Sequence, residues 1–592
     1  MKGGIMVKNE VGEVRPGQLI TTYGPGAIMD SINDSLMILD IKYWYNCNEK
    51  IHDRKLSNFL KKDYFKKIPS LNYKDLPVIP FPNYHVCSNN KCSRLFDIRE
   101  AFVMSDYLDK GPKCPDCNWK SYPARFVVSC QENHLDDFPW RWWVHDGKET
   151  DCRGKLYLKS SGNTSSLNSL YVQCECGKWE TMKGATQESS FEGMKCAGNH
   201  PHKLNKKSDC GLALIPLQRG ASNVYFPALR SAIVIPDESE NIDRLFVTLK
   251  DEIESFMKSL GTMLGDKWYI KFYEFKLENS KEFTDAEDFL KKWTAYKNKE
   301  NSNQENEELE YSQIKQIEYQ AFTSFEEKIK LSSFEAEIEE VPNDLKPYFK
   351  RIVKAHKLKE ILVLLGFMRN DSPEPDVKKP KKIVWLESDN NENWLPAVEV
   401  HGEGIFIEFN KNSIKQWLKK NEELAKKSQQ FTSLYSNWIK SKGWELRDQK
   451  DVIYVMLHTF AHLLIKQLSL QSGYSSVAIK ERIYCGEDMA GILLYTGSTD
   501  QEGSLGGLVE MGNIDKLRIL ILEALEEAAF CSNDPYCASL RPSEENHLNG
   551  CACFACSMVA ETSCETGNRL LDRSLVVSTI DSDFEPYFEG LL

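Results

Sequence analysis

The residues best suited to chemistry in this 592-residue chain are its 18 cysteines, most of which fall into two groups. Ten lie within residues 87–210 and six within residues 531–564, whereas Cys47 and Cys485 stand apart. The N-terminal stretch lacks the long apolar core of a secretory signal, and no later stretch approaches the about 18 uncharged apolar residues of a membrane span. We therefore expect a soluble, cytoplasmic chain with no membrane partner, in which clustered cysteines bind metal instead of forming disulfides.

Two cysteine pairs near residue 100 match the spacing of a zinc ribbon. Cys87 and Cys92 form C-x4-C, and Cys114 and Cys117 form C-x2-C after an intervening loop. Each tight turn presents two thiolates, and two such turns complete the tetrahedral coordination of one zinc ion. Because four cysteine ligands leave no open position for water, the expected role of this site is structural.

A second zinc site is predicted further along the chain, with less regular spacing. Its expected ligands are Cys174, Cys176, Cys196 and Cys210, and either of two histidines could replace one of them, namely His200 or His202. Three further residues are interpreted preferentially as buried thiols and a packed histidine: Cys130, His134 and Cys152. The alternative is that they add to either site or form a third one.

The catalytic signatures that the sequence suggests are incomplete. His458 and His462 have the i, i+4 spacing of a metalloprotease helix, but Thr459 stands where the general-base glutamate is required. Packed histidines in an apolar helix are the favoured interpretation. No G-x-x-x-x-G-K-[ST] loop occurs, so ATP hydrolysis is not expected, and the glycine-rich GSLGG at 503–507 is interpreted as a close-packed turn. We therefore expect no enzyme activity from this chain.

The elements that position these residues are predicted from apolar spacing. Helices are expected at 242–264, 344–368, about 411–442 and about 449–470, and ahead of Phe530. A strand pair turned at His401–Gly404 is expected over 397–409, with two further strands over 476–485 and 490–498. The acidic run at 298–311 is interpreted as a solvated connection.

The chain as a whole is predicted to be an α+β multi-domain protein. Its expected parts are an N-terminal segment, zinc-ribbon-like modules, a mainly helical middle, a linker and a C-terminal α/β domain, at residues 1–80, 81–236, 237–371, 372–382 and 383–592. A formal net charge of −12 indicates that the surface as a whole does not bind nucleic acid, so any DNA contact must be local or shared with a partner.

Longer stretches carry a family resemblance. The C-terminal segments HTFAHLLIKQLSL, ERIYCGEDMAGILLYTGSTDQEGSLGGL, CASL, CACFAC and ETSCETGNRLLDR resemble the MrfA-type zinc-binding (MZB) domain found at the end of certain superfamily 2 helicases. The stretches RPGQLITTYGPGAIMD, RFVVSCQENHLDDFPWRWWVH, LQRGASNVYFP and VHGEGIFIEF are similar to the DrmB family of the DISARM anti-phage systems. The resemblance spans about residues 15–575.

The resemblance implies a non-catalytic accessory subunit. Its partner would be a separate DrmA-like helicase that supplies ATP hydrolysis and engages DNA, alongside a methyltransferase and other defence components. It also assigns the C-terminal zinc ligands to Cys531, Cys537, Cys553 and Cys556, with Cys564 as a competing fourth ligand and Cys551 beside the metal. Together with the N-terminal sites, two or three structural zinc ions are expected.

An aromatic run is the candidate DNA-facing surface. DFPWRWWVH at 137–145 could stack on unpaired bases, and nearby arginines could meet phosphates: Arg125, Arg141 and Arg219. A tryptophan-rich core is nevertheless the favoured interpretation of this run. Two other functions stay open, a metal-dependent nuclease or hydrolase and a purely structural scaffold that does not touch DNA.

Overall fold

The computed structural model describes residues 14–592 apart from internal gaps. The gaps cover residues 31–33, 45–46, 69–75, 102–110, 163–165, 236–244, 247–248, 260–266, 279, 281, 303–309, 374–381, 389–391, 447–448 and 498–506. Most of the expected linker at 372–382, half of the acidic run at 298–311 and most of GSLGG at 503–507 therefore lie outside the described residues.

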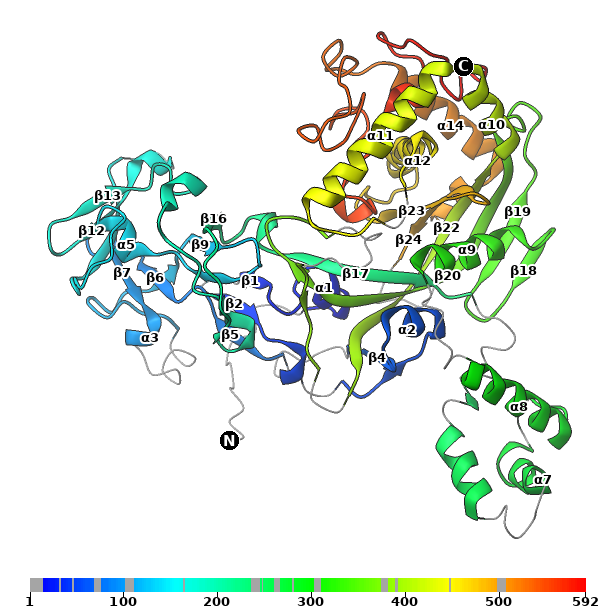
Figure 1. The fold of residues 1–592 in the computed structure, drawn as a ribbon, viewed down its shortest axis with the longest axis horizontal. Helices are drawn as coiled ribbons and strands as arrows, with labels where there is room; N and C mark the ends of the chain where they lie inside the picture. The colour runs from blue at the N-terminus through cyan, green and yellow to red at the C-terminus, as the bar shows by residue number, and fades with distance from the viewer. Residues whose placement is uncertain are drawn as a thin grey trace.

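A large, mostly antiparallel sheet forms the centre of the molecule (Figure 1). Its two longest strands, β20 (Phe349–Met368) and β22 (Trp394–Phe409), run side by side. The strands follow one another across the sheet in the order β18–β19–β20–β22–β24–β23. The four shorter strands of this order are β18 (Lys328–Lys330), β19 (Glu335–Glu339), β24 (Ala490–Thr496) and β23 (Ile479–Cys485). Shorter strands extend it through β20 or β22, and these are β17 (Phe226–Ile233), β21 (Val384–Trp385), β4 (Tyr64–Lys67) and, beyond β4, β3 (Lys50–Ile51). The sheet thus joins segments from both halves of the chain.

Helices cover both faces of this sheet, because successive side chains of a strand point to opposite faces. Phe406 of β22 stacks on Phe322 of α9 (Tyr311–Thr323), with ring centroids 4.7 Å apart. Its neighbours Ile405 and Ile407 belong instead to the cluster that contains α12 (Val452–Gln471). The helices near α12 are α10 (Lys411–Lys420), α11 (Glu422–Ser441), α13 (Gly507–Met511) and α14 (Ile514–Ala529). Two N-terminal helices also contact the sheet, α1 (Pro16–Thr21) and α2 (Arg54–Leu60).

Helix α12 is the main core helix of this unit. It begins after Asp451, whose carboxylate accepts hydrogen bonds from the backbone N–H groups of Ile453 and Tyr454. Among the described residues it is the one helix long and apolar enough to cross a membrane, with a mean hydropathy of 1.2. However, 83% of that apolar stretch is buried inside the protein, as expected of a core helix.

The cysteine-rich region lies at one end of the molecule and consists of small sheets (Figure 1). A six-stranded sheet contains β13 (Trp179–Thr181), β12 (Leu170–Cys174), β11 (Leu156–Ser160), β7 (Arg94–Asp97), β6 (Tyr84–Cys87) and β8 (Ser121–Pro123). Next to it are β10 (Leu135–Asp137), β9 (Phe126–Ser129) and β16 (Ile215–Gln218), the pair β14 (Asn199–His200) and β15 (Lys206–Lys207), and the trio β1 (Ile28–Asp30), β2 (Ser35–Ile38) and β5 (Val78–Pro80). The short helix α5 (Trp140–Val144) lies in the core of this region.

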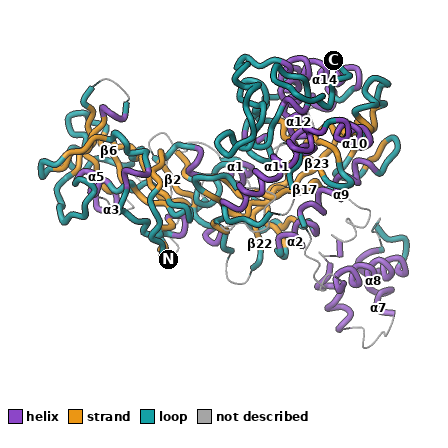
Figure 2. Tube along the Cα trace, turned by 45° about the horizontal axis from the view of Figure 1, so that its top comes forward, coloured by secondary structure: helices purple, strands orange, loops and turns teal. Residues whose placement is uncertain are grey.

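A separate helical part projects from the sheet unit (Figure 2). It contains helical turns at 249–259, α7 (Trp268–Phe272), the π-helical turn η7 (Tyr273–Leu277) and α8 (Ala286–Ser302), around an aromatic core of its own. The predicted helical middle is confirmed here and in α9. Other short helical turns are η1 (Ile41–Tyr43), α3 (Ile98–Ala101), η2 (Leu167–Ser169), η3 (Glu188–Phe191), η4 (Pro201–Lys203), η5 (Ser222–Val224), η8 (Glu561–Ser563) and η9 (Arg573–Leu575).

Two predicted elements near the middle of the chain were wrong. The expected helix at 344–368 is strand β20, which is buried on both faces for much of its length and therefore has the continuous apolar run that also suits a buried helix. The expected strand pair over 397–409 is the single strand β22. Its glycines serve close packing instead of a turn, because a Cβ on Gly402 would collide with the carbonyl oxygen of Thr496.

The remaining C-terminal predictions agree with the structure more closely. The helix expected at about 449–470 is α12, and the strands expected at 476–485 and 490–498 are β23 and β24. The helix expected at about 411–442 is divided into α10 and α11 at Asn421, which adopts an extended backbone conformation.

Candidate metal centres

Histidine, cysteine and glutamate side chains converge in five groups among the described residues, where the sequence predicts two or three sites. In each group the candidate ligand atoms lie within 4.8 Å of one another. We call them the ribbon site (Cys87, Cys92, Cys114, Cys117), the junction site (Cys130, His134, Cys196, Cys210), the knuckle site (His145, Cys152, Cys174, Cys176), the C-terminal four-cysteine site (Cys531, Cys537, Cys553, Cys556) and the buried mixed site (His458, His462, Glu481, Cys564).

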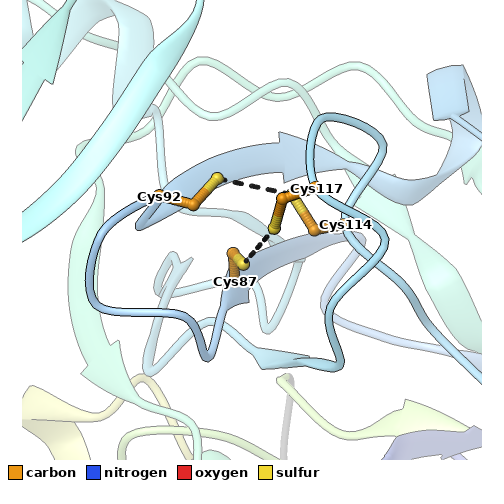
Figure 3. A group of neighbouring side chains, drawn as sticks. All are labelled: Cys87, Cys92, Cys114 and Cys117. Carbon is orange, nitrogen blue, oxygen red and sulfur yellow. Dashed lines mark hydrogen bonds between the residues drawn. The ribbon is translucent and has the colours of Figure 1, made fainter.

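The ribbon site joins the four cysteines that the sequence predicts (Figure 3). Cys87 ends β6, Cys92 precedes β7, and Cys114 and Cys117 come from the turn before β8. The Sγ atoms of Cys87 and Cys117 are 3.4 Å apart, and those of Cys92 and Cys114 are 3.7 Å apart. Four sulfurs at about 2.3 Å from one zinc ion would be about 3.8 Å apart, whereas a disulfide needs about 2.05 Å. The spacing therefore fits a shared metal ion and not a disulfide.

The predicted second quartet is wrong as a group, because its members belong to two different sites. Cys174 and Cys176 lie at the knuckle site with His145 and Cys152. The Sγ atoms of Cys152 and Cys174 are 3.6 Å apart, and Cys176 Sγ is 3.4 Å from His145 Nε2. The other ring nitrogen of His145, Nδ1, lies 2.7 Å from the Arg141 carbonyl oxygen, which orients Nε2 toward the cysteines.

Cys196 and Cys210, the other half of that quartet, lie at the junction site. Here Cys130 Sγ is 3.2 Å from His134 Nδ1 and 4.0 Å from Cys210 Sγ. His134 Nε2 hydrogen-bonds the Ser208 hydroxyl at 2.7 Å, which fixes the ring. The favoured interpretation of Cys130, His134 and Cys152 as residues outside any site is therefore corrected: each joins a ligand group.

The two histidines proposed as replacement ligands are outside the groups. His200 Nε2 hydrogen-bonds Ser208 at 3.1 Å, and His202 is buried against the ring of Phe367, with centroids 5.1 Å apart. The C-x3-H spacing of Cys130 and His134 is the sequence pattern that could have indicated the junction site. His145 had no comparable signal, because it reaches its cysteines only through the fold.

The C-terminal four-cysteine site contains the ligands that the family resemblance assigns. The Sγ distances are 3.5 Å between Cys531 and Cys553, 3.7 Å between Cys537 and Cys556, and 3.8 Å between Cys553 and Cys556. Cys551 packs in the same cluster without joining the four, as predicted. The suggestion that Cys564 competes as a ligand here is wrong, because Cys564 lies at the buried mixed site.

The turns that carry these cysteines also support their thiolates. In four of the turns the backbone N–H two residues after a cysteine donates to its Sγ, at 3.3–3.4 Å for Cys87, Cys130, Cys196 and Cys531. Burial raises the pKa of the Cys174 and Cys531 thiols to about 11, so the crowded thiols of one site cannot all ionise without a neighbouring cation. A divalent ion supplies that charge, and sulfur and imidazole donors favour zinc over magnesium or calcium.

The aromatic run at 137–145 is core, as the favoured interpretation held. Trp140 is 1% exposed, and Arg141 donates to the carbonyl oxygens of Cys152 and Gly154. The other two arginines proposed for phosphates are also engaged, because Arg125 bonds Gln218 and Arg219 pairs with Asp30. The run therefore contributes mainly to the core, and the three arginines have partners within the protein.

Other aromatic side chains do reach solvent, and they adjoin the metal-group cysteines. Trp119 follows Cys117 by two residues and Trp179 follows Cys176 by three, and both are more than half exposed. At the C-terminal four-cysteine site the exposed aromatics are Phe530, Tyr536 and Phe554, each next to a cysteine in the sequence.

Comparison with known proteins places this arrangement in a family. Residues 15–226 match a family described as "Domain of unknown function (DUF8724)", and residues 460–557 match the MrfA Zn-binding domain. A DISARM protein DrmB from Bacillus paralicheniformis is 71% identical over 568 residues, which cover 95% of this chain and 100% of the relative. The chain belongs to the DrmB family. The resemblance noted in the sequence is confirmed: the chain is similar to a DISARM protein over most of its length and contains a MrfA Zn-binding domain.

The match to the MrfA Zn-binding domain divides the C-terminal groups. It contains all four residues of the C-terminal four-cysteine site. At the buried mixed site it contains His462 and Glu481 but ends before Cys564 and begins after His458. In this chain, the C-terminal four-cysteine site is therefore the group that lies entirely within the matched zinc-binding domain.

Proposed function

We propose that this chain is a non-catalytic, cytoplasmic accessory subunit of a DISARM system. It binds a separate, DrmA-like superfamily 2 helicase and helps to position foreign DNA for that motor during anti-phage restriction. The observation that carries the proposal is the placement of exposed aromatic side chains on turns that metal groups hold rigid. Rigid, solvent-exposed aromatics are suited to stacking on unpaired bases or to anchoring a protein partner.

The ribbon and knuckle sites supply the DNA-facing part of this surface. Lys155 joins their turns, since its Nζ lies 3.1 Å from Asp116 Oδ1 at the ribbon site and its backbone N–H donates to Glu175 Oε2 at the knuckle site. The turn of Trp119 and the turn of Trp179 therefore lie on one part of the molecule. Lys120, which is exposed and next to Trp119 in the sequence, adds positive charge for phosphates, whereas Lys178, next to Trp179, pairs with Asp146.

A closed set of protein ligands supports the non-catalytic role. Each of the ribbon, junction, knuckle and C-terminal four-cysteine sites has four protein donors, whereas catalytic zinc keeps a position for water. Metal bound there would fix the positions of the surrounding turns, and the chemistry of restriction would fall to the partner subunits.

The test is to purify the chain with its helicase and compare ATPase activity and single-stranded DNA affinity with each component alone. We expect the complex to exceed both components. Replacing both Trp119 and Trp179 with alanine should weaken DNA binding by the complex at least about tenfold, because base stacking contributes about 1–3 kcal/mol per aromatic. Trp385→Ala is the matched control, since Trp385 is similarly exposed but lies on β21 of the central sheet.

Different outcomes would favour the other functions. Metal-dependent cleavage of DNA by the purified chain alone would identify a nuclease and overturn the accessory role. A complex that forms and retains full DNA affinity after both tryptophan substitutions, with no crosslink between this chain and DNA, would identify a scaffold. Failure to bind the helicase at all would remove the proposal.

A further inference from the structure

The buried mixed site brings together four side chains from three separated segments. His458 and His462 lie one turn apart on α12, Glu481 lies on β23, and Cys564 directly follows the helical turn η8. The side chains of both histidines and of Glu481 are fully buried. Such a set of imidazole, carboxylate and thiol groups in a protein interior needs an explanation, because buried polar groups are normally satisfied by partners.

The candidate donor atoms point at one another. His458 Nε2 lies 2.9 Å from Glu481 Oε1 and 3.2 Å from Cys564 Sγ. His462 Nε2 lies 3.4 Å from Glu481 Oε2. Two histidine nitrogens, a carboxylate and a sulfur thus surround one small volume.

The outer contacts of the histidines show which ring nitrogens face inward. Nδ1 of His458 lies 3.2 Å from the carbonyl oxygen of Leu570, and Nδ1 of His462 lies 2.8 Å from that of Ser557. A carbonyl oxygen only accepts, so each Nδ1 carries the proton that it donates. In a neutral imidazole the Nε2 atom then presents a lone pair, as in metal-binding histidines oriented by a backbone carbonyl.

With both rings neutral, the two Nε2 atoms and the Glu481 carboxylate are acceptors that face one another inside the group. His462 Nε2 and Glu481 Oε2 are buried and have no hydrogen-bond partner. Glu481 Oε1 already accepts the backbone N–H of Glu565 at 3.1 Å, and Cys564 Sγ accepts that of Asn568 at 3.2 Å. These contacts hold the carboxylate and the sulfur in place while leaving their other lone pairs directed at the centre.

We propose that the buried mixed site binds a divalent transition-metal ion through His458, His462, Glu481 and Cys564. Zinc is the ion best suited to two imidazoles, one carboxylate and one thiolate in a four-ligand shell, and magnesium and calcium are excluded by the nitrogen and sulfur donors. All four ligands come from the protein and the site is closed to water, so the ion is structural. It fastens α12 to β23 and to the segment that follows the C-terminal four-cysteine site.

This site is distinct from the one that the zinc-binding family describes. Two of its ligands, His458 and Cys564, lie outside residues 460–557, and none is shared with the C-terminal four-cysteine site. The proposal is also independent of the proposed function, because the metal content of the chain does not depend on a helicase or on DNA.

The first experiment measures zinc bound to the purified full-length chain by elemental analysis. We expect five zinc ions per chain, one for each group. Cys564→Ser and Glu481→Gln should each remove one equivalent. Their matched controls are Cys551→Ser, a buried thiol outside the five groups, and Glu360→Gln, a buried carboxylate on β20, which should leave the metal content unchanged.

The second experiment remains informative if a variant fails to fold. Anomalous scattering at the zinc absorption edge, from crystals of the unaltered protein, should show an ion within about 2.0–2.3 Å of His458 Nε2, His462 Nε2 and Cys564 Sγ. A peak at the four cysteine-containing sites but none between α12 and β23 would overturn the proposal. The same conclusion would follow from a folded Cys564→Ser variant that retains every zinc ion.

Discussion

The cysteine-rich region and the central sheet unit both contain candidate metal sites, but they differ in how much apolar core surrounds them. The ribbon, junction and knuckle sites lie among sheets of short strands, with modest clusters around Trp140 and Phe138. The two C-terminal sites adjoin a single large cluster that extends through β20, β22 and α12. Small layers bury too little apolar surface to be stable alone, so metal bound in the first region would replace core. In the second, metal would fix peripheral segments to a core that already exists.

Metal removal should give the largest difference between the two regions. A structural zinc ion contributes an apparent binding free energy of about 10–16 kcal/mol in small domains, and three of the candidate sites lie in the cysteine-rich region. With a strong chelator, hydrogen exchange should therefore become fast across residues 84–217 while β20 and β22 stay protected. Added zinc should reverse the change. Simultaneous loss of protection in β20 would show that the two regions form one cooperative unit.

Acid should produce the next largest difference. The pKa of the Cys130 thiol is lowered from 9.0 to about 5, and a hydrogen bond with Cys196 is the largest cause. Because the pKa of Cys130 is lowered in the folded protein, its contribution to stability is complete above the ordinary thiol pKa of 9.0. That contribution is lost as the pH falls through about 5. In the sheet, Lys354 lowers the pKa of Glu337 from 4.5 to about 2, so its contribution is complete above 4.5 and is lost only as the pH falls through about 2.

Protons also compete with a metal ion for thiolate ligands, so at a pH of about 4 the junction site should release its ion while the sheet stays folded. Zinc release followed with a chromophoric chelator, together with far-ultraviolet circular dichroism, measures the two events separately. Retention of all zinc at that pH would contradict this prediction.

A buried ion pair offers a smaller test, confined to the sheet unit. Glu318 of α9 accepts hydrogen bonds from Arg482 Nε at 2.6 Å and Nη2 at 2.8 Å, and also from the Tyr484 hydroxyl. Glu318→Ala leaves a buried guanidinium uncompensated and should lower the free energy of unfolding of this unit by about 3–5 kcal/mol in urea denaturation. Asp146→Ala, which removes an exposed pair with Lys178 in the cysteine-rich region, should cause no measurable change.

The smallest expected effect concerns the start of the core helix. Asp451→Ala removes the carboxylate that caps α12 and should cost about 1 kcal/mol, because two backbone N–H groups lose their partner. Thermal unfolding of the sheet unit measures this loss. Asp451→Asn is the control, since the asparagine oxygen can still cap the helix, and an equal loss in both variants would assign the effect to charge.

The sequence predicted the local chemistry better than the long-range arrangement. The ribbon site is encoded in two tight turns, so its four ligands can be found from spacing alone. His145 is different, because it joins Cys174 and Cys176 only after α5 packs against β12 and β13. The same limit applies to β20: a continuous apolar run does not reveal whether its partner will be a strand or a helix.

The buried mixed site is a second case in which the sequence shows some of the ligands but not the packing that brings them together. The i, i+4 spacing of His458 and His462 is visible in the sequence, but the missing glutamate at position 459 directs attention away from metal. The carboxylate is supplied instead by Glu481 on a strand, and the thiol by Cys564, far along the chain. Only the packing of β23 against α12 brings them together.

The parallel pairing of β4 with β22 has a consequence for synthesis of the protein. Lys62 hydrogen-bonds Asn393, 331 residues later, and the strand that follows Lys62 has no place in the sheet until β22 has been made. At about 5–20 residues per second, a ribosome needs roughly 15–70 s to cover that distance. Phe65, fully buried in the finished fold, lacks its β22 partner Leu395 throughout this interval. Slower, cooler expression with added chaperones should therefore raise the yield of correctly folded chain.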